Sequence, residues 1–166
     1  MTTLMLEEAL SAPDTVAQQL AQDEAAYARL GESLRAQPPS SLLTVARGSS
    51  DHAAHYLAYL VMARLGRLVT SLPMSLVTLY GSRIQCDGLV SFAFSQSGQS
   101  PDLVEPTGNF RQHGARTVAF VNAAGSPLGA AAEHLFPLHA GPERSVAATK
   151  SYIAQLVAGA RVVAHW

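Results

Sequence analysis

The chain has 166 residues, 48% hydrophobic and 14% charged, which predicts one globular domain with a buried core rather than two full domains. Its net charge of −1, with 11 Lys and Arg spread along the sequence, excludes bulk electrostatic attraction to nucleic acid or an anionic membrane. The single cysteine, Cys86, excludes an internal disulfide framework, and the sequence shows neither a membrane-spanning run nor a secretion signal, so a cytoplasmic protein is expected.

Helical patterns and short apolar runs alternate along the chain. In chain order, the sequence predicts a helix over 14–36, a strand over 42–46, a helix over 51–65, strands over 67–72 and 89–94, a helix over 101–112, strands over 116–121 and 134–138, and a last helix over 146–164. This alternation predicts a three-layer α/β/α sandwich with a five-stranded parallel sheet, of the flavodoxin-like kind. Residues 1–39 are expected to form an N-terminal helical segment packed on a domain of residues 40–166.

The most informative loop follows the apolar run 89–94 and reads Ser-Gln-Ser-Gly-Gln-Ser over residues 95–100. It lies between a predicted strand and a helix that begins with Pro101. Backbone N–H groups and the helix dipole at such a position favour an anion, and hydroxyl groups complete its shell. The loop therefore predicts binding of a phosphorylated small molecule, although serines at a helix start can also serve only as caps.

Two further loops are expected at the same edge of the sheet, because ligand loops of parallel sheets gather at the carboxyl ends of the strands. One is residues 48–50, where a serine that caps the next helix can also bind a ligand. The other is 141–150, whose Glu143 is the only carboxylate of the three loops apart from the helix-starting Asp51 and Asp102. Glu143 is thus the candidate base, with a plain surface carboxylate as the alternative.

Other site chemistries lack support in the sequence. His52 and His55 lie one helical turn apart without a third ligand at suitable spacing, so no metal site is expected. The sequence contains no nucleophile elbow, Walker loop or Gly-x-Gly-x-x-Gly motif, which argues against a hydrolase, an NTPase or a dinucleotide enzyme. No cofactor is expected.

Four segments together carry a family resemblance. They are residues 47–53 (Arg-Gly-Ser-Ser-Asp-His-Ala), 95–102 (Ser-Gln-Ser-Gly-Gln-Ser-Pro-Asp), Val-Asn at 121–122 with Ser-Pro-Leu at 126–128, and 143–150 ending in Ala-Ala-Thr-Lys. In this order and spacing the chain resembles a sugar isomerase (SIS) domain. Within that family it is most similar to the first SIS domain of the isomerase half of glucosamine-6-phosphate synthase and to its deaminase relatives. The resemblance covers about residues 40–166.

The resemblance implies a set of substrate-binding positions. Those matching the family's phosphate loop are Ser95, Gln96, Ser97 and Ser100. Ser49 and Ser50 match the loop that contacts the sugar hydroxyls or the C2 substituent, and Val146 and Ala148 match the loop that lines the sugar. Ala148 stands where the family usually has serine, which removes one possible hydrogen bond to the ligand.

The resemblance also implies two alternative functions. One is an enzyme, or the binding half of one, that isomerises or deaminates amino-sugar phosphates such as glucosamine 6-phosphate and fructose 6-phosphate, without a glutaminase domain. Glu143 is then the candidate catalytic base within this chain. The other is a non-catalytic phosphosugar sensor or regulatory module. In either case the chain resembles the first half of a two-SIS protein, and a homodimer or pairing with a second SIS domain, through helices 14–36 and 146–166, is expected.

Overall fold

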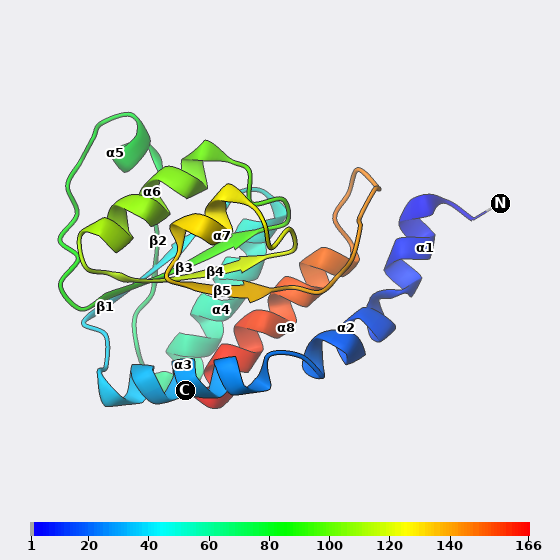
Figure 1. Ribbon diagram of the computed structural model, residues 1–166, viewed down its shortest axis with the longest axis horizontal. Coiled ribbons are helices and arrows are strands. Elements are labelled where there is room, and N and C mark those ends of the chain that lie inside the picture. Colours follow the sequence, from blue (N-terminus) through cyan, green and yellow to red (C-terminus); the bar gives the residue numbers. More distant parts are fainter. Residues whose placement is uncertain (1) are drawn as a thin grey trace.

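The computed structural model describes residues 2–166 and consists of a parallel sheet between two layers of helices (Figure 1). The strands are β1 (Ser41–Val45), β2 (Thr70–Ser71), β3 (Leu89–Ser95), β4 (Arg116–Val121) and β5 (His134–Pro137). They pair in the order β2-β1-β3-β4-β5, and every pair is parallel. The predicted five-stranded parallel sheet in a three-layer sandwich is therefore confirmed.

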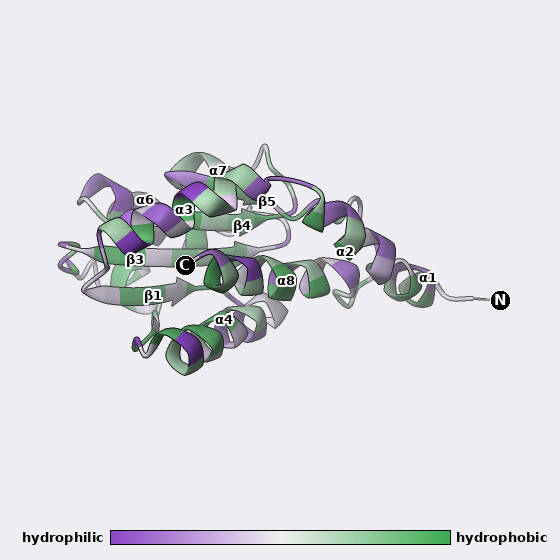
Figure 2. Ribbon diagram, turned by 90° about the horizontal axis from the view of Figure 1, so that it is seen from below, coloured by the Kyte–Doolittle hydropathy of each residue, from purple (hydrophilic) through white to green (hydrophobic). Residues whose placement is uncertain are grey.

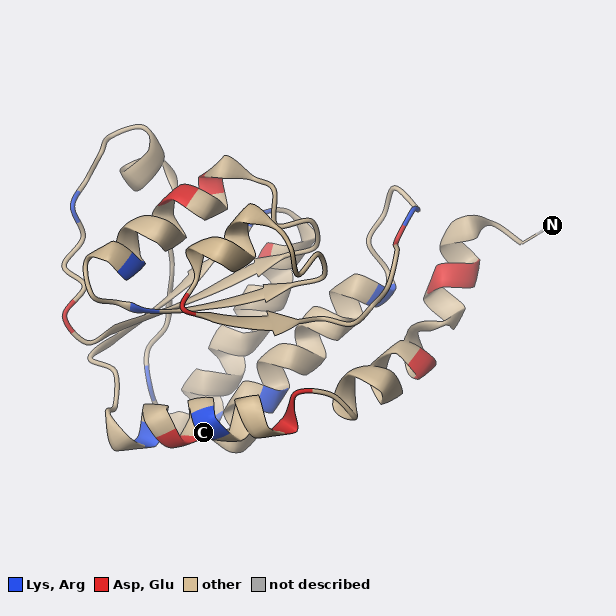
Figure 3. Cartoon of the chain, in the orientation of Figure 1, with Lys and Arg blue, Asp and Glu red and all other residues tan. Residues whose placement is uncertain are grey.

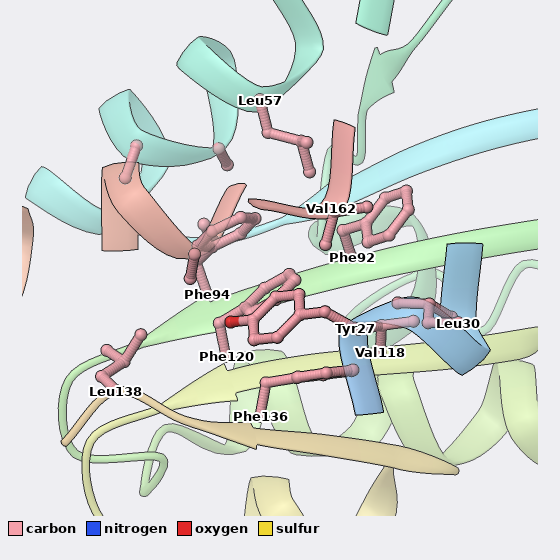
Figure 4. Close-up of a cluster of buried hydrophobic side chains, with 14 of the residues drawn as sticks. Tyr27, Leu30, Leu57, Phe92, Phe94, Val118, Phe120, Phe136, Leu138 and Val162 are labelled. Carbon is pink, nitrogen blue, oxygen red and sulfur yellow. The ribbon is translucent and has the colours of Figure 1, made fainter. Parts of the chain in front are cut away.

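Strand β3 lies at the centre of the sheet, and all seven of its residues are buried. Because side chains alternate along a strand, Phe92 and Phe94 enter one core cluster while Ala93 enters the cluster on the opposite face. Aromatic rings fill the first cluster, where the Phe94 and Phe120 ring centroids lie 4.6 Å apart (Figure 4). A strand covered on both faces explains why its sequence reads as a continuous apolar run.

The helices divide between the two faces of the sheet, as Figure 2 shows for α4 and α8 on one side and α6 and α7 on the other. The first face is covered by α3 (Glu24–Ala36), α4 (Ser49–Leu65) and α8 (Lys150–His165). The second is covered by α5 (Ser75–Thr78), α6 (Pro101–Gln112) and α7 (Pro127–Ala131). Gly159 of α8 lies against Leu57 of α4, so the two longest helices pack closely.

The N-terminal region differs from the prediction of one helix over 14–36. It forms three helices, namely α1 (Leu4–Leu10), α2 (Ala12–Leu20) and α3. The chain turns at Asp23, which has a left-handed backbone (φ 59°). The Arg161 side chain fixes this turn from α8, donating to the carbonyl oxygens of Gln19 and Gln22 at 2.8 Å each. The apolar spacing continues across the break, which is why the sequence alone suggested one helix.

Two short helices, α5 and α7, were not predicted, and the other differences concern where elements begin and end. The second strand comprises only Thr70–Ser71 rather than 67–72, and α8 begins at Lys150 rather than at 146. Helices α2 and α3 each pack against α8 within the chain. Part of the apolar surface that was expected to meet a second domain is therefore buried within the chain, while residues such as Leu20 stay exposed.

Charged residues are scattered over the structure rather than gathered in one patch (Figure 3). This agrees with the balance of charges in the sequence. Within residues 2–166, no helix combines the length and the apolar character needed to cross a membrane.

Gly31 marks the closest approach of α3 to α8, because a Cβ atom there would lie 2.1 Å from the backbone oxygen of His165. Gly31→Ala is therefore expected to lower the free energy of unfolding by about 1–3 kcal/mol through overpacking, measured by urea denaturation.

Gly108→Ala in α6 is the matched control, since its added Cβ would meet only the Ala131 Cβ, at 3.9 Å. This variant is expected to gain about 0.5–1 kcal/mol from helix propensity. Equal stability of the two variants would contradict close packing at Gly31.

Candidate functional site

The loops that leave β1, β3, β4 and β5 meet at the carboxyl edge of the sheet, toward which all the strand arrows in Figure 1 point. Between the loops after β3, β4 and β5 lies an open groove of about 440 Å³. Its lining residues are Gln96, Ser97, Gln99, Asn122, Ala123, Gly141, Pro142 and Glu143. The groove thus combines the predicted phosphate loop with the predicted sugar loop, and its walls are mainly polar or small.

The loop 95–100 is held in shape by its own hydrogen bonds. The Ser95 hydroxyl oxygen accepts the Gly98 N–H at 2.8 Å, and the Gly98 carbonyl accepts the Leu128 N–H at 3.1 Å. Gly98 has φ +64°, and a Cβ atom there would lie 2.2 Å from Ser126 Oγ. Only glycine satisfies both the backbone conformation and this close contact. The loop is therefore folded before any ligand arrives.

Several donors of this loop point to no protein partner. Within the described chain, the backbone N–H groups of Ser97 and Ser100 make no hydrogen bond. Ser100 is the N-cap residue of α6, but its side chain makes no capping bond. Ser97 is exposed, and its hydroxyl accepts only a long 3.4 Å bond from Gln99 N. Free amides and hydroxyls at the start of a 12-residue helix form a favourable environment for an anion.

An ion pair joins the first loop to the start of α6. Arg47, directly before Gly48, contacts the carboxylate of Asp102 in the first turn of α6. Asp102 would otherwise place an uncompensated negative charge near the loop 95–100. Arg47 therefore balances the charge at the helix N-terminus.

Asn122 connects the loops after β4 and β5. Its Nδ2 donates to the Gly141 carbonyl at 2.7 Å, and its Oδ1 accepts the Ala140 N–H at 2.9 Å. Sequence reasoning did not select Asn122 or Gln99 as site residues, although both line the groove. The available signal was the position of Asn122, directly after a predicted strand at the ligand-binding edge.

Glu143 lines the groove, but its carboxylate faces the start of α8. One oxygen accepts Thr149 N at 3.0 Å, Thr149 Oγ1 at 2.9 Å and Ser151 N at 3.2 Å, and the other accepts the Ser151 hydroxyl. Partial burial raises the pKa of the Glu143 carboxyl, but the bonds from Ser151 and Thr149 outweigh it, so the net pKa is lowered. In this structure the carboxylate caps α8.

The remaining predicted site residues do not line the groove. Ser49 is exposed at the first position of α4, whereas Ser50 is buried and its hydroxyl accepts Gln155 Nε2 at 3.0 Å. Val146 is fully exposed at the tip of the 141–149 loop, and Ala148 is half-buried beside it. The structure therefore brings Gln96, Ser97 and Glu143 into one groove, and the other predicted residues are not among those that line it.

Comparison with known proteins identifies the family. The SIS domain family model matches residues 37–164. A glutamine–fructose-6-phosphate aminotransferase (isomerizing) of Sulfolobus acidocaldarius is 37% identical over 116 residues, which is 70% of this chain. A structure described as a phosphosugar isomerase from Silicibacter pomeroyi is 42% identical and superposes with a TM-score of 0.95 over 99% of this chain. These matches confirm the predicted family and the predicted relation to the isomerase region of the aminotransferases.

A more distant structure, the Vibrio vulnificus NanR protein complexed with ManNAc-6P, shares the fold at 23% identity and a TM-score of 0.80, over 95% of this chain and 59% of that one. The relatives are longer than this chain. It covers 50% of the Silicibacter chain and 19–24% of the curated aminotransferases that it matches.

Replacing Glu143 with Gln is expected to lower the free energy of unfolding by about 1–3 kcal/mol at neutral pH, because bonds to a charged acceptor are lost. Folding lowers the pKa of this carboxyl, so its stabilisation is complete above the ordinary value of 4.5 and is lost as the pH falls through the lower folded value. Urea denaturation at neutral and acidic pH measures both effects, with Glu105→Gln, at an exposed position of α6, as the control. A difference between wild type and Glu143→Gln that stays constant at acidic pH would contradict this role.

Proposed function

Because the chain belongs to the SIS domain family, we propose that its carboxyl-edge loops bind a sugar phosphate, with the phosphate on residues 95–100. The observation that carries this proposal is the prefolded Gly98 loop, which leaves the N–H groups of Ser97 and Ser100 unpaired at the start of α6. Such donors bind a dianionic phosphate through charge-assisted hydrogen bonds. Ser95 contributes by holding the loop, since its oxygen already accepts the Gly98 N–H.

The sugar is then assigned to the adjoining groove, whose volume of about 440 Å³ lies in the range of small-molecule sites. Gln96 and Asn122 line this space, and the family resemblance adds Ser49, Ser50, Val146 and Ala148 as proposed contacts of the sugar. The names of the aminotransferase relatives and of the NanR complex favour a hexose or amino-hexose 6-phosphate. Glucosamine 6-phosphate and fructose 6-phosphate are the proposed ligands.

The proposed reaction is aldose–ketose isomerisation or deamination, in which a base moves a proton between C1 and C2 of the open-chain sugar. Glu143 is the candidate base within this chain, because it is the carboxylate that lines the groove. To act, it must exchange its bonds with Thr149 and Ser151 for the substrate. Its lowered pKa makes it a weak base in the present arrangement.

The capping bonds of Glu143 favour a second candidate function, a module that binds phosphosugar without turning it over, or that takes its base from a second domain.

We propose pairing with a second SIS domain or a second copy of the chain. Two observations support pairing. The chain covers only half of the Silicibacter relative, and α4 exposes apolar side chains, those of Tyr56, Tyr59 and Met62. Light scattering of the purified chain distinguishes a dimer from a monomer.

Isothermal titration tests the binding proposal directly. Glucosamine 6-phosphate and fructose 6-phosphate are titrated, with glucosamine as the unphosphorylated control. Binding that depends on the phosphate supports the assignment, and equal binding of glucosamine would refute it. Incubation in deuterated water then separates the two candidate functions, because only an isomerase exchanges the proton at C1 or C2.

Ser97→Ala is expected to weaken glucosamine 6-phosphate binding by about 1.5–3 kcal/mol, because one hydrogen bond to a charged group is lost. Ser41→Ala is the matched control, since this exposed serine begins β1 at the opposite edge of the sheet. Titration of both variants measures the effect. An unchanged affinity of Ser97→Ala for glucosamine 6-phosphate would refute the assignment of the phosphate to this loop.

Ser95→Asp is expected to abolish detectable binding, because it places a negative charge where the phosphate would lie. It also removes the hydroxyl that accepts the Gly98 N–H, so circular dichroism must first show that the variant folds. Ser95→Ala separates the two effects, since it removes the hydroxyl without adding charge. Normal binding by a folded Ser95→Asp variant would exclude the site.

A further inference from the structure

Helix α1 buries only one of its side chains, and that side chain is a carboxylate. Glu8 is 8% exposed, whereas the apolar Leu4, Met5, Leu6 and Leu10 of the same helix are each 45–69% exposed. Carboxylates are rarely buried unless they are paired. The position of α1 is therefore explained by what Glu8 binds rather than by an apolar core.

The Glu8 carboxylate binds the loop between β5 and α8. One oxygen accepts the backbone N–H of Arg144 at 2.7 Å, and the other accepts that of Ser145 at 3.1 Å. Hydrogen bonds from Ser145 and Arg144 lower the pKa of Glu8, so these contacts favour its ionised form. Figure 3 shows acidic positions on α1, and a loop before α8 that carries charges of both signs.

The loop 141–149 contains neither helix nor strand, so these carboxylate bonds matter to its shape. Glu8 holds it at Arg144 and Ser145, and Glu143 holds its far end at Thr149. Within the loop, the Ser145 hydroxyl donates to the Ala147 carbonyl at 2.9 Å. Val146 and Ala148 lie between the two anchors, while Gly141 and Pro142 line the groove.

We propose that Glu8 is a positioning residue for ligand binding, since it fixes the loop 141–149 beside the groove and thereby sets the affinity for the sugar part of the ligand. This inference rests on the proposed function. A loop that is ordered before binding loses less conformational entropy when the ligand binds. Glu8 contacts neither the groove nor the phosphate loop, so its effect is exerted through the backbone of Arg144 and Ser145.

Glu8→Gln is the appropriate change, because its size is conserved while one accepting oxygen becomes an N–H₂ donor that faces a backbone N–H. Glu7→Gln is the matched control on the same helix. Glu7 is exposed, and its carboxylate accepts only a local bond, from Thr2 Oγ1 at 2.6 Å. Thermal unfolding must show that both variants fold. Glu7→Gln is expected to match wild type, while Glu8→Gln loses the stabilisation of two bonds to a charged acceptor at the periphery of the fold (Figure 1).

The first measurement is the rate of amide hydrogen exchange at Arg144 and Ser145, observed by NMR in the absence of ligand. In Glu8→Gln these two amides are expected to exchange about tenfold faster or more, because their acceptor is lost, while Glu7→Gln leaves them unchanged. Unchanged exchange in Glu8→Gln would show that Glu8 does not hold the loop and would overturn the inference.

The second measurement compares the affinities for glucosamine 6-phosphate and for inorganic phosphate. Glu8→Gln is expected to weaken the first about three- to tenfold and to leave the second unchanged, because inorganic phosphate needs only residues 95–100. Equal losses for both ligands would indicate a general structural defect and overturn the positioning role. Absence of sugar-phosphate binding in wild type would overturn the proposed function and the link to affinity, while amide exchange would still decide whether Glu8 holds the loop.

Discussion

The parallel pairing of β3 with β1 and β4 is the constraint on which the rest of the structure depends. Val45 at the end of β1 lies opposite Ala93, and Ser95 at the end of β3 lies opposite Val121 at the end of β4. Each strand therefore releases its loop at the same edge. Since β3 is buried on both faces, its side chains can reach a polar ligand only where the strand ends. Ser95 is the last residue of the strand, and the polar loop begins there.

The loops at this edge divide their polar groups between two tasks. Ser95, Asn122 and Glu143 use their side chains to fix backbone atoms of neighbouring turns. Ser97 and Ser100 keep donors that have no partner in the described chain. A site of this kind is stable without its ligand because its supporting groups are already satisfied, and its free donors are aligned by a rigid backbone.

Sequence patterns predicted the sheet, its longer helices and the polar loop 95–100 at the strand's end, because these depend on local periodicity and on glycine and serine chemistry. They did not predict the break at Asp23, which Arg161 stabilises from a distant helix, nor the start of α8 at Lys150, which the Glu143 cap determines. They also missed Glu8, whose partners lie 136 and 137 residues away. The features that could not be predicted are single polar contacts between distant segments, because such contacts leave no periodic signal in the sequence.

The guanidinium of Arg161 has a consequence for the order in which the chain becomes structured during synthesis. It lies 4.0 Å from the centre of the Tyr27 ring and binds Gln19 across a separation of 142 residues. A ribosome makes α2 and α3 early, yet the groups that fix the turn between them emerge only with α8. Helices α2 and α3 therefore reach their final positions only after α8 has been made, and the apolar surfaces that α8 covers stay exposed until then.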